Sequence, residues 1–248
     1  MTETSDKYGS RLLLDTMYNV RDLGGYPTKS GQMTAYGHFL RADAPNRLSD
    51  ADLHKLLEYP VTTVIDLRSP SENNEEQYRL RNNPNVDYFN IPLLGFDMMA
   101  SIMAMNETDD PYIAIPDLYI RLLDKACEPI GKVMTRLAGA KPGTCMFHCT
   151  HGKDRTGIIS ALLLLLADVN DEDIIANYQV SATYLKPWFD TFIADLPAEI
   201  LHFFKTDPDS MEKTLEYFHK TYISAEKYLT CCGVAAQSLN RLRQKLVG

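Results

Sequence analysis

The stretch TCMFHCTHGKDRTGIISALLLLLA, residues 144–167, decides the fold. TCMFHC (144–149) has the apolar character of a buried strand, and RTGIISALLLLLA (155–167) predicts a helix that is apolar on nearly every side and therefore central. A glycine-containing loop joins the two. A helix that begins directly after such a loop directs backbone N–H groups and its positive dipole end at one place, so the stretch predicts an anion cradle.

The segments on either side alternate between strand and helix patterns. VTTVIDL (61–67) is β-branched and nearly all apolar, as expected of a strand buried on both faces. This alternation implies an α/β fold with a central, mostly parallel sheet flanked by helices and a helical C-terminal part. The other predicted elements are strands at Leu12–Val20, Met33–Leu40 and 87–94, a helix over 51–59 capped by Ser49 and Asp52, a helical stretch from Asp117 to Leu137 broken near Glu128-Pro129, and at least three helices within 172–246.

The chain shows no internal repeat and no low-complexity tract. We interpret residues 1–10 as a flexible tail and residues 11–248 as a single domain, with the helices of 172–246 packing on it. The Met-rich segment 96–105 has no clear strand or helix boundary. This segment could form either a mobile flap or a plain surface helix.

Composition argues against several classes of partner. The net charge of −8 and the pI near 5.2 argue against a nucleic-acid-binding protein, which needs a basic field. The longest apolar run, 158–167, is shorter than the span of about 20 residues that crosses a bilayer. The polar N-terminus does not resemble a secretory signal. No stable membrane insertion is therefore expected, and the oligomeric state is left open.

Cysteine usage favours a reducing setting. Five cysteines in a chain of this length do not form a disulfide framework, so a cytoplasmic location is expected, with non-classical secretion left open. The adjacent Cys231 and Cys232 are interpreted as free thiols, buried or half-buried, and a redox role for them is left open. The histidines have no zinc-like spacing, and the sequence predicts no metal and no other cofactor.

The residues of the loop suit nucleophilic attack on a phosphoryl group. Cys149 lies where the amides and the helix dipole favour the thiolate, directly beneath a bound phosphoryl group. Arg155 can bind two phosphate oxygens with its fork. Thr156 can donate its hydroxyl to the sulfur when the sulfur leaves. The predicted phosphate-binding residues are Thr150, His151, Gly152, Lys153, Asp154, Arg155 and Thr156, with glycine supplying the tight turn.

The motif CTHGKDRTG (149–157) resembles the C-x5-R-[ST] phosphate-binding loop of cysteine-dependent phosphatases. The lysine–aspartate pair before its arginine is similar to that of the bacterial atypical tyrosine phosphatases, a dual-specificity and lipid-active family found in mycobacteria and Listeria. NVRDLGGY (19–26), FLRADAPNRLSD (39–50) and VIDLRSPSE (64–72) resemble the N-terminal half of this family. The resemblance implies a protein-tyrosine-phosphatase fold. It also implies that phosphotyrosine, often phosphoserine, phosphothreonine and phosphoinositides too, is hydrolysed to inorganic phosphate.

The leaving oxygen needs a proton, and three aspartates compete to supply it. Asp154 ranks first, because it lies in the loop itself, where the resemblance to myotubularin-like phosphatases implies an acid. Asp66 ranks second, because it ends a predicted central strand and should emerge at the crevice beyond the carboxyl ends of the strands. Asp117 ranks third. It stands 32 residues before Cys149, about the spacing of the movable acid loop in ordinary tyrosine phosphatases, but it also suits the first turn of a helix.

Two loop residues bear on the substrate. Lys153 is not required for a simple monoester, so we expect it to pair with Asp154 or Asp66 or to meet a second phosphate, as on a phosphoinositide. The alternative is a solvated lysine on the outer side of the loop. His151 departs from the family pattern, because many relatives carry a small residue at this position. We expect this difference to affect the rim of the pocket and the substrate preference.

Other polar residues near these motifs have structural explanations. His148 is expected to order the backbone beside Cys149 and not to act directly. Arg68 could reach a substrate phosphate or form an ion pair with a neighbouring carboxylate. Arg21 and Asp22 are expected to pin the turn that follows them.

The alternative function is a phospho-ligand-binding pseudophosphatase, which would cradle phosphate without turnover. Such proteins usually lose the cysteine, the arginine or the acid, and this sequence retains candidates for all three. A thiol-redox enzyme fits less well, because the sequence contains no C-x-x-C motif.

Overall fold

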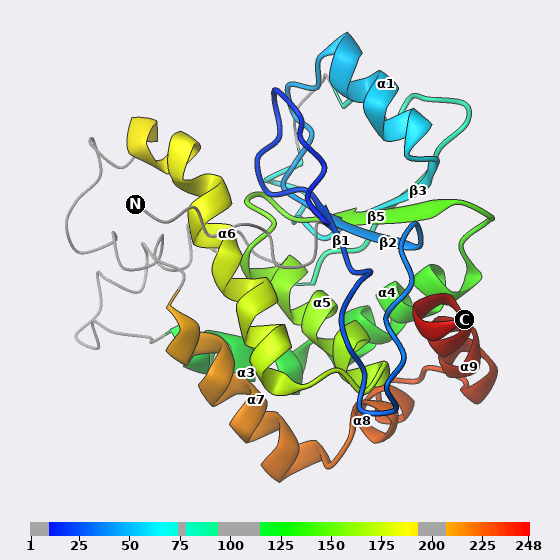
Figure 1. Ribbon diagram of the computed structural model, residues 1–248, viewed down its shortest axis with the longest axis vertical. Helices are drawn as coiled ribbons and strands as arrows, with labels where there is room; N and C mark the ends of the chain where they lie inside the picture. The colour runs from blue at the N-terminus through cyan, green and yellow to red at the C-terminus, as the bar shows by residue number, and fades with distance from the viewer. Residues whose placement is uncertain (1–9, 74–77, 94–114, 193–206) are drawn as a thin grey trace.

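The computed structural model describes residues 10–73, 78–93, 115–192 and 207–248 (Figure 1). At its centre is a five-stranded sheet with the order β1-β2-β5-β3-β4. The β1–β2 pair is antiparallel, and the other pairs are parallel. The strands are β1 (Arg21–Asp22), β2 (Phe39–Ala42), β3 (Val61–Asp66), β4 (Asp87–Asn90) and β5 (Thr144–His148).

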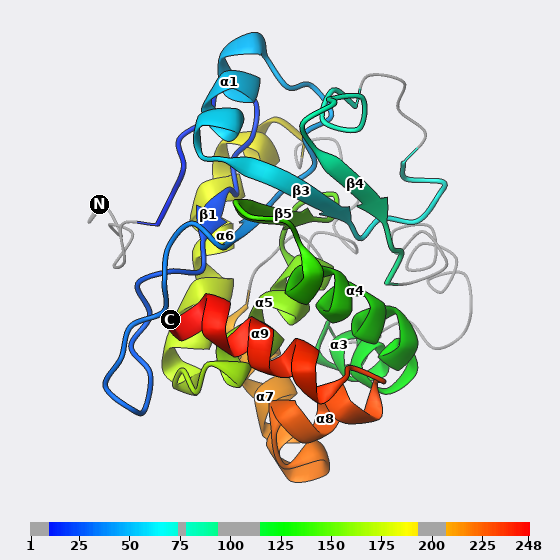
Figure 2. The same cartoon turned by 90° about the vertical axis from the view of Figure 1, so that its right-hand side faces the viewer.

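Helices cover both faces of this sheet. Val64 and Met146 pack on one face in the same apolar cluster as Leu56 of α1, while Ile65 and Phe147 belong to the larger cluster on the other face, with α4, α5 and α9. Figure 2 shows α1 on one side of β3 and β5, and α4, α5 and α9 on the other. The helices are α1 (Asp50–Glu58), α3 (Ile115–Lys125), α4 (Cys127–Gly139), α5 (Asp154–Leu166), α6 (Asp171–Phe192), α7 (Pro208–Tyr222), α8 (Ala225–Cys231) and α9 (Ala236–Val247).

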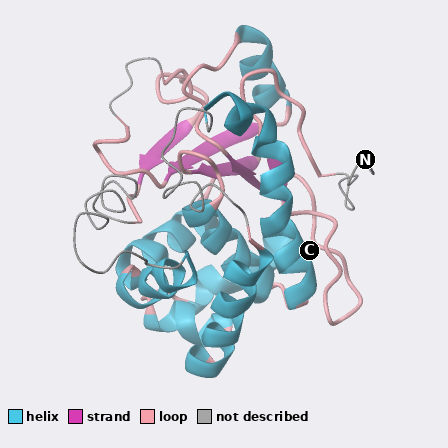
Figure 3. Ribbon diagram, turned by 90° about the vertical axis from the view of Figure 1, so that its left-hand side faces the viewer, coloured by secondary structure: helices cyan, strands magenta, loops and turns pink. Residues whose placement is uncertain are grey.

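The predicted fold class is confirmed. A mostly parallel sheet lies between helical layers, and the C-terminal part is helical from α6 to α9. In Figure 3 most of the helices lie below the sheet. The predicted strands at 61–67 and 144–149 correspond to β3 and β5, and the predicted apolar helix at 155–167 corresponds to α5. Ser49 caps α1 by accepting a hydrogen bond from the Asp52 N–H, as its spacing predicts.

The predicted N-terminal strands are wrong in position. In place of Leu12–Val20 and Met33–Leu40, the strands are the short β1 and β2. Carboxylates bind the backbone N–H groups of this segment in place of a neighbouring strand. Asp52 accepts from the N–H groups of Asp15 and Thr16. Asp43 accepts from those of Tyr18 and Asn19. Side-chain acceptors thus replace the strand ladder over this segment.

The helical stretch from Asp117 to Leu137 is interrupted, as predicted, but two or three residues earlier than expected. Ala126 lies between α3 and α4, so Pro129 falls in the first turn of α4. A proline is tolerated there because the first-turn N–H groups have no partner within the helix.

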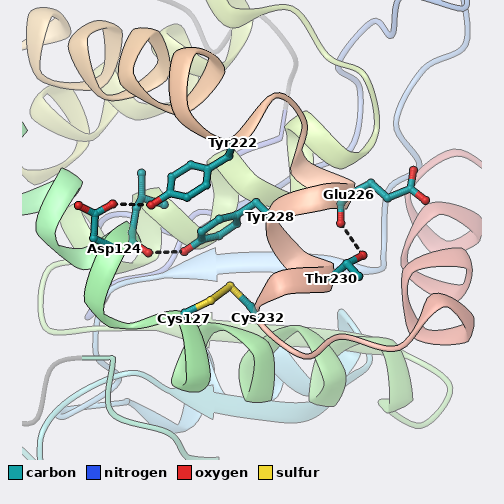
Figure 4. Close-up of a disulfide and its surroundings, with 8 residues drawn as sticks. Asp124, Cys127, Tyr222, Glu226, Tyr228, Thr230 and Cys232 are labelled. Atoms are coloured by element: carbon teal, nitrogen blue, oxygen red, sulfur yellow. Dashed lines mark hydrogen bonds between the residues drawn. A yellow bond between two sulfur atoms is a disulfide. The ribbon is translucent and has the colours of Figure 1, made fainter.

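The prediction of free thiols at 231–232 is wrong for Cys232. Cys232 forms a disulfide with Cys127, with 4.7 Å between the two Cα atoms (Figure 4). The bond joins the start of α4 to the end of α8, and α4 can approach so closely because residue 131 is glycine: a Cβ at Gly131 would lie 1.9 Å from the Cys232 carbonyl oxygen. Cys231 is free and exposed.

Within the described ranges, no helix is both long and apolar enough to cross a membrane. The Met-rich segment 96–105 and residues 1–9 of the predicted tail lie outside these ranges.

Candidate active site

The succession of strand, loop and helix places the predicted nucleophile in a buried loop. β5 ends at His148, and α5 begins at Asp154. Cys149 lies between them with 2% of its surface exposed. Gly152 has a φ of +63°, and a Cβ there would lie 2.3 Å from the Ala42 carbonyl oxygen, so only glycine fits this turn.

Three donors outside the loop hold its carbonyl groups. Asn19 Nδ2 donates to the carbonyl oxygens of His151 at 2.9 Å and Gly152 at 3.1 Å, and Arg41 Nη2 donates to that of Gly152 at 2.6 Å. The Ala44 N–H donates to the Thr150 carbonyl at 3.1 Å. Since C=O and N–H point in opposite directions across a trans peptide, these outward carbonyls direct the N–H groups of the same peptides toward the inside of the loop.

The N-terminal RD motif supports this arrangement from a distance. Arg21 donates to the Asn19 side-chain oxygen and, at 2.6 Å, to the Asn177 carbonyl of α6. Asp22 accepts from the N–H groups of Gly24 and Gly37, so it pins the turn as expected. Sequence reasoning missed Asn19 and Arg41 as loop anchors, although both lie in segments that carry the family resemblance.

Arg155 is held by a residue that the sequence analysis did not single out. Its Nη1 and Nη2 donate to Oε2 and Oε1 of Glu72, both at 2.6 Å, and Thr150 Oγ1 donates to Oε1 at 2.7 Å. Burial alone would lower the pKa of Arg155, but the hydrogen bonds to Glu72 and the electrostatic contact with Cys149 raise it above its ordinary value. The sequence contains one clue to Glu72: it is the last residue of VIDLRSPSE (64–72), a segment that carries the family resemblance.

Two buried polar atoms of the loop have no hydrogen-bond partner in the described part of the chain. They are Arg155 Nε and Thr156 Oγ1. Buried donors are almost always satisfied in folded proteins, so their presence beside Cys149 indicates a place for a ligand with oxygen acceptors.

Asp66 is enclosed by its neighbours. It is completely buried, and it accepts from Arg68 Nε at 3.0 Å and Nη2 at 2.9 Å and from the Tyr88 hydroxyl at 2.9 Å. Burial alone would raise the pKa of Asp66, but the hydrogen bonds and the positive charge of Arg68 outweigh it and lower the pKa. Arg68 thus forms the ion pair that was one of its two expected roles.

His148 contributes to the loop through its ring. The carbonyl oxygen of Cys149 lies 3.1 Å from Nδ1 and can only accept, so Nδ1 carries the proton, and Nε2 accepts from the Tyr78 hydroxyl at 2.5 Å. Burial lowers the pKa of His148, which favours this neutral form. The ring therefore orients the backbone beside Cys149.

Asp154 lies in the first turn of α5 with 9% of its surface exposed. The Tyr119 hydroxyl donates to its Oδ1, and Lys153 Nζ lies 3.4 Å from the same oxygen. Asp117 is exposed in the first turn of α3, and no hydrogen bond or ion pair joins it to the loop among the described residues. The structure thus brings Asp154, and not Asp117, to the loop.

Lys153 and His151 shape the surroundings of the loop. Only 1% of the Lys153 surface is exposed, which excludes the solvated alternative, and its Nζ lies 3.4 Å from Oδ1 of Asp154. The His151 ring lies 4.7 Å from the Trp188 ring and 5.8 Å from the Phe189 ring of α6, measured between centroids. Burial lowers the pKa of His151 to about 4, so the ring is neutral near pH 7.

The arrangement suits the binding of an oxyanion above a nucleophile. A buried cysteine lies at the base of a loop whose amides face inward, beside an arginine fixed by a carboxylate. No group of three or more His, Cys, Asp or Glu side chains arranged to hold a metal ion occurs within the described ranges.

Comparison with known proteins assigns the chain to a family. The sequence profile of the tyrosine phosphatase family matches residues 12–248. A tyrosine-protein phosphatase of Nostoc commune is 32% identical over 224 residues, covering 84% of this chain and 74% of that protein. The triple specificity protein phosphatase PtpB of Mycobacterium tuberculosis is 24% identical over 254 residues, covering 86% of this chain and 91% of that protein. The solved structure of P. aeruginosa TpbA aligns with a TM-score of 0.47 at 14% identity, covering 93% of this chain and 99% of that one.

The chain therefore belongs to the tyrosine phosphatase family, a class of phosphoric monoester hydrolases.

Proposed function

We propose that this protein hydrolyses phosphomonoesters through a phosphocysteine intermediate on Cys149, with phosphotyrosine in proteins as its principal substrate. The observation that carries the proposal is the Arg155 guanidinium, which Glu72 holds beside Cys149 with its Nε left without a partner among the described residues. The substrate phosphate would supply the missing acceptors, to Arg155 and to the inward N–H groups of residues 151–153.

The reaction has two steps. In the first, the Cys149 thiolate attacks phosphorus, the bond from phosphorus to the ester oxygen breaks, and the departing oxygen takes a proton from the acid. In the second, water attacks the phosphocysteine, gives a proton to the same carboxylate, and the S–P bond breaks to release inorganic phosphate. Thr156, whose hydroxyl is buried and without a described partner, would donate to the departing sulfur.

Asp154 is the acid that the contacts favour. Both of its described partners, Tyr119 and Lys153, approach Oδ1, so Oδ2 is the oxygen suited to carry the proton. Asp66 is a poor acid, because its lowered pKa and its ion pair with Arg68 keep it ionised and enclosed. Asp117 has no described contact that ties it to the loop.

The substrate range extends to phosphoserine, phosphothreonine and phosphoinositides. Lys153 supports this extension, because a second cation lies beside a loop that already has Arg155 for the first phosphate. A relative at 24% identity is named a triple specificity protein phosphatase, which agrees with a broad range.

The disulfide between Cys127 and Cys232 is informative about the redox state of the compartment in which the protein resides. A reducing, cytoplasmic setting was expected from the cysteine count, but disulfides form and persist mainly in oxidising compartments. The bond between Cys127 and Cys232 therefore favours an oxidising location over the cytoplasm.

The decisive experiment combines turnover with trapping of the intermediate. Purified protein is assayed with p-nitrophenyl phosphate in EDTA, and parallel reactions with a 32P-labelled phosphotyrosine peptide are quenched in acid. We expect metal-independent turnover and a labelled protein, both abolished in Cys149→Ser, which should still bind phosphate esters. Binding without turnover would instead support the pseudophosphatase alternative, and turnover in Cys149→Ser would exclude the phosphocysteine mechanism.

A further inference from the structure

An open pocket of about 340 Å³ lies between the edge of the sheet and the helices α4 and α9. One face of β3 and β4 forms its floor, where Thr63 pairs with Asp87 and Phe89 follows on the same face. Figure 2 shows this side of the molecule, with β4 at the sheet edge and α4 and α9 beside it. The volume falls within the range of about 300–1,000 Å³ that small-molecule sites have.

The pocket is separate from the candidate active site. Thr63 pairs with Cys145, the second residue of β5, whereas Cys149 follows the last residue of β5 at the opposite end of the strand. A ligand in this pocket would therefore lie at the amino ends of the strands, and its binding does not depend on the proposed reaction.

Positive charge gathers around the pocket. Arg136, Lys141 and Arg241 line it together with one carboxylate, Asp87, in a chain whose net charge is −8. Lys141 Nζ is paired with Asp87 at 3.0 Å. Neither Arg136 nor Arg241 has a carboxylate partner among the described residues, and the Arg136 guanidinium lies 4.5 Å above the centre of the Phe89 ring. The pocket thus has two guanidinium groups available to an anion.

The usual alternative explanation for cations at this place does not apply. Cations near the C-terminus of a helix often bind its last carbonyl groups. At the end of α4, however, Lys245 Nζ already donates to the carbonyl oxygens of Leu137 and Ala140, both at 3.1 Å. The two arginines are therefore not needed for that purpose.

A buried hydroxyl gives a second, independent indication of a ligand. Thr63 lines the pocket with 1% of its surface exposed, and its Oγ1 has no hydrogen-bond partner in the described part of the chain. An unsatisfied buried hydroxyl is costly to a folded protein unless something else satisfies it. A ligand oxygen at the pocket floor would do so.

We propose that this pocket binds a small organic anion that carries a phosphate or carboxylate group. The anionic group would be held by Arg136 and Arg241, which offer planar forks to its oxygens. The body of the molecule would lie against Phe89, and the Thr63 hydroxyl would hydrogen-bond to it.

Phenylphosphonate is a suitable probe, because it has an oxyanion and an aromatic body but no ester bond to hydrolyse. Titration of the full-length protein, followed by 1H–15N NMR, separates the two sites by the amides that shift. We expect saturable shifts at residues 87–89, 136–141 and 238–241, with a Kd of their own, besides any at the loop 149–155. Shifts confined to the loop would overturn the proposal.

Variants then assign the binding to named side chains. The double variant Arg136→Gln/Arg241→Gln should raise the Kd of this pocket by about tenfold or more, since two charge-assisted contacts are lost, and leave the Kd of the loop unchanged. Arg243→Gln is the matched control, because Arg243 lies on the same helix but pairs with Glu226. An unchanged Kd in the double variant would contradict the proposal.

Thr63→Val tests the hydroxyl with little change in shape. We expect an unchanged or raised Tm, because no described hydrogen bond is lost, together with a Kd for phenylphosphonate raised about three- to tenfold. An unchanged Kd in a folded Thr63→Val protein would remove the hydroxyl from the site.

Discussion

The Glu72 carboxylate fixes the Arg155 guanidinium at both ends of its fork, with Nη1 to Oε2 and Nη2 to Oε1 each at 2.6 Å. Ser69 fixes Glu72 in turn, since its N–H and its hydroxyl donate to Oε2 at 3.0 and 2.9 Å. The side chains of Arg155 and Glu72 are only 3% and 12% exposed, so water competes little with the pair. The guanidinium is therefore oriented before any substrate arrives.

Removing the Glu72 carboxylate should damage both catalysis and stability. We expect Glu72→Ala to lower kcat/KM for p-nitrophenyl phosphate by about tenfold or more, because Arg155 loses its orientation. The loss of one partner of a buried ion pair should cost about 3–5 kcal/mol of unfolding free energy. Steady-state kinetics and urea unfolding measure the two effects. As a control, Glu226→Ala removes the surface partner of Arg243 and should change neither. A folded Glu72→Ala protein with normal kcat/KM would show that Arg155 does not need this support.

The stabilising effect of Glu72 should depend on pH. Burial alone would raise its pKa, but the Arg155 contacts outweigh burial and lower it from its ordinary 4.5 to about 2. A carboxyl whose pKa is lowered in the folded state stabilises the fold above its unfolded pKa, and this contribution is lost as the pH falls through the folded pKa. The difference in unfolding free energy between the wild type and Glu72→Gln should therefore be constant above about pH 5 and shrink between about pH 4.5 and 2. A difference that stays constant down to pH 2 would argue against the ionised pair.

The elements that sequence could predict are those with a local pattern. The strand at 144–149, the apolar helix at 155–167 and the cap at Ser49 each follow from neighbouring residues. The candidate nucleophile and arginine were found for the same reason, since six positions separate them in one motif.

The contacts that escaped prediction join residues far apart in the chain. Glu72 and Arg155 are 83 residues apart, Arg41 and Gly152 are 111 apart, and the two cysteines of the disulfide are 105 apart. The local sequence pattern does not indicate such long-range contacts, because they form only when the elements of the fold pack together. The N-terminal strands were misplaced because carboxylates of Asp43 and Asp52 accept from backbone N–H groups that a sheet would otherwise use.

The disulfide between Cys127 and Cys232 should stabilise the helical part of the protein. A cross-link between residues so far apart restricts the unfolded chain, and its removal typically costs about 2–4 kcal/mol. We expect Cys127→Ser to lower the free energy of unfolding by this amount, with kcat/KM unchanged because the bond lies at the α4–α8 contact and not at the loop. Cys231→Ser is the matched control, since that thiol is free and exposed. Equal stability of the Cys127→Ser and Cys231→Ser proteins would show that the bond does not form in solution.

Lys153 should affect substrates unequally. If its ammonium meets a second phosphate, Lys153→Met should lower kcat/KM for phosphoinositides about tenfold to a hundredfold and for p-nitrophenyl phosphate much less, the range expected for one charge-assisted contact. A uniform loss on both substrates would indicate that Lys153 acts through Asp154, 3.4 Å away. Unchanged kinetics on both would contradict either role.

The identity of the general acid can be read from the leaving group. A phosphatase that loses its acid suffers most on an ester with a poor leaving group, because that oxygen needs a proton as it departs. Asp154→Asn should therefore lower kcat on an alkyl phosphate by about a hundredfold or more, and much less on p-nitrophenyl phosphate, whose leaving group needs little protonation.

Asp66→Asn serves as the comparison, because Asp66 is buried against Arg68 and its pKa is lowered. Loss of its charge leaves a buried guanidinium without its carboxylate, so we expect a lower free energy of unfolding and similar relative losses of kcat on both esters. The ratio of kcat values for the two esters, measured with each variant and the wild type, isolates proton donation from any general disturbance. Equal losses on both esters for Asp154→Asn would give Asp154 a loop-ordering role, and a selective loss for Asp66→Asn would transfer the acid role to Asp66.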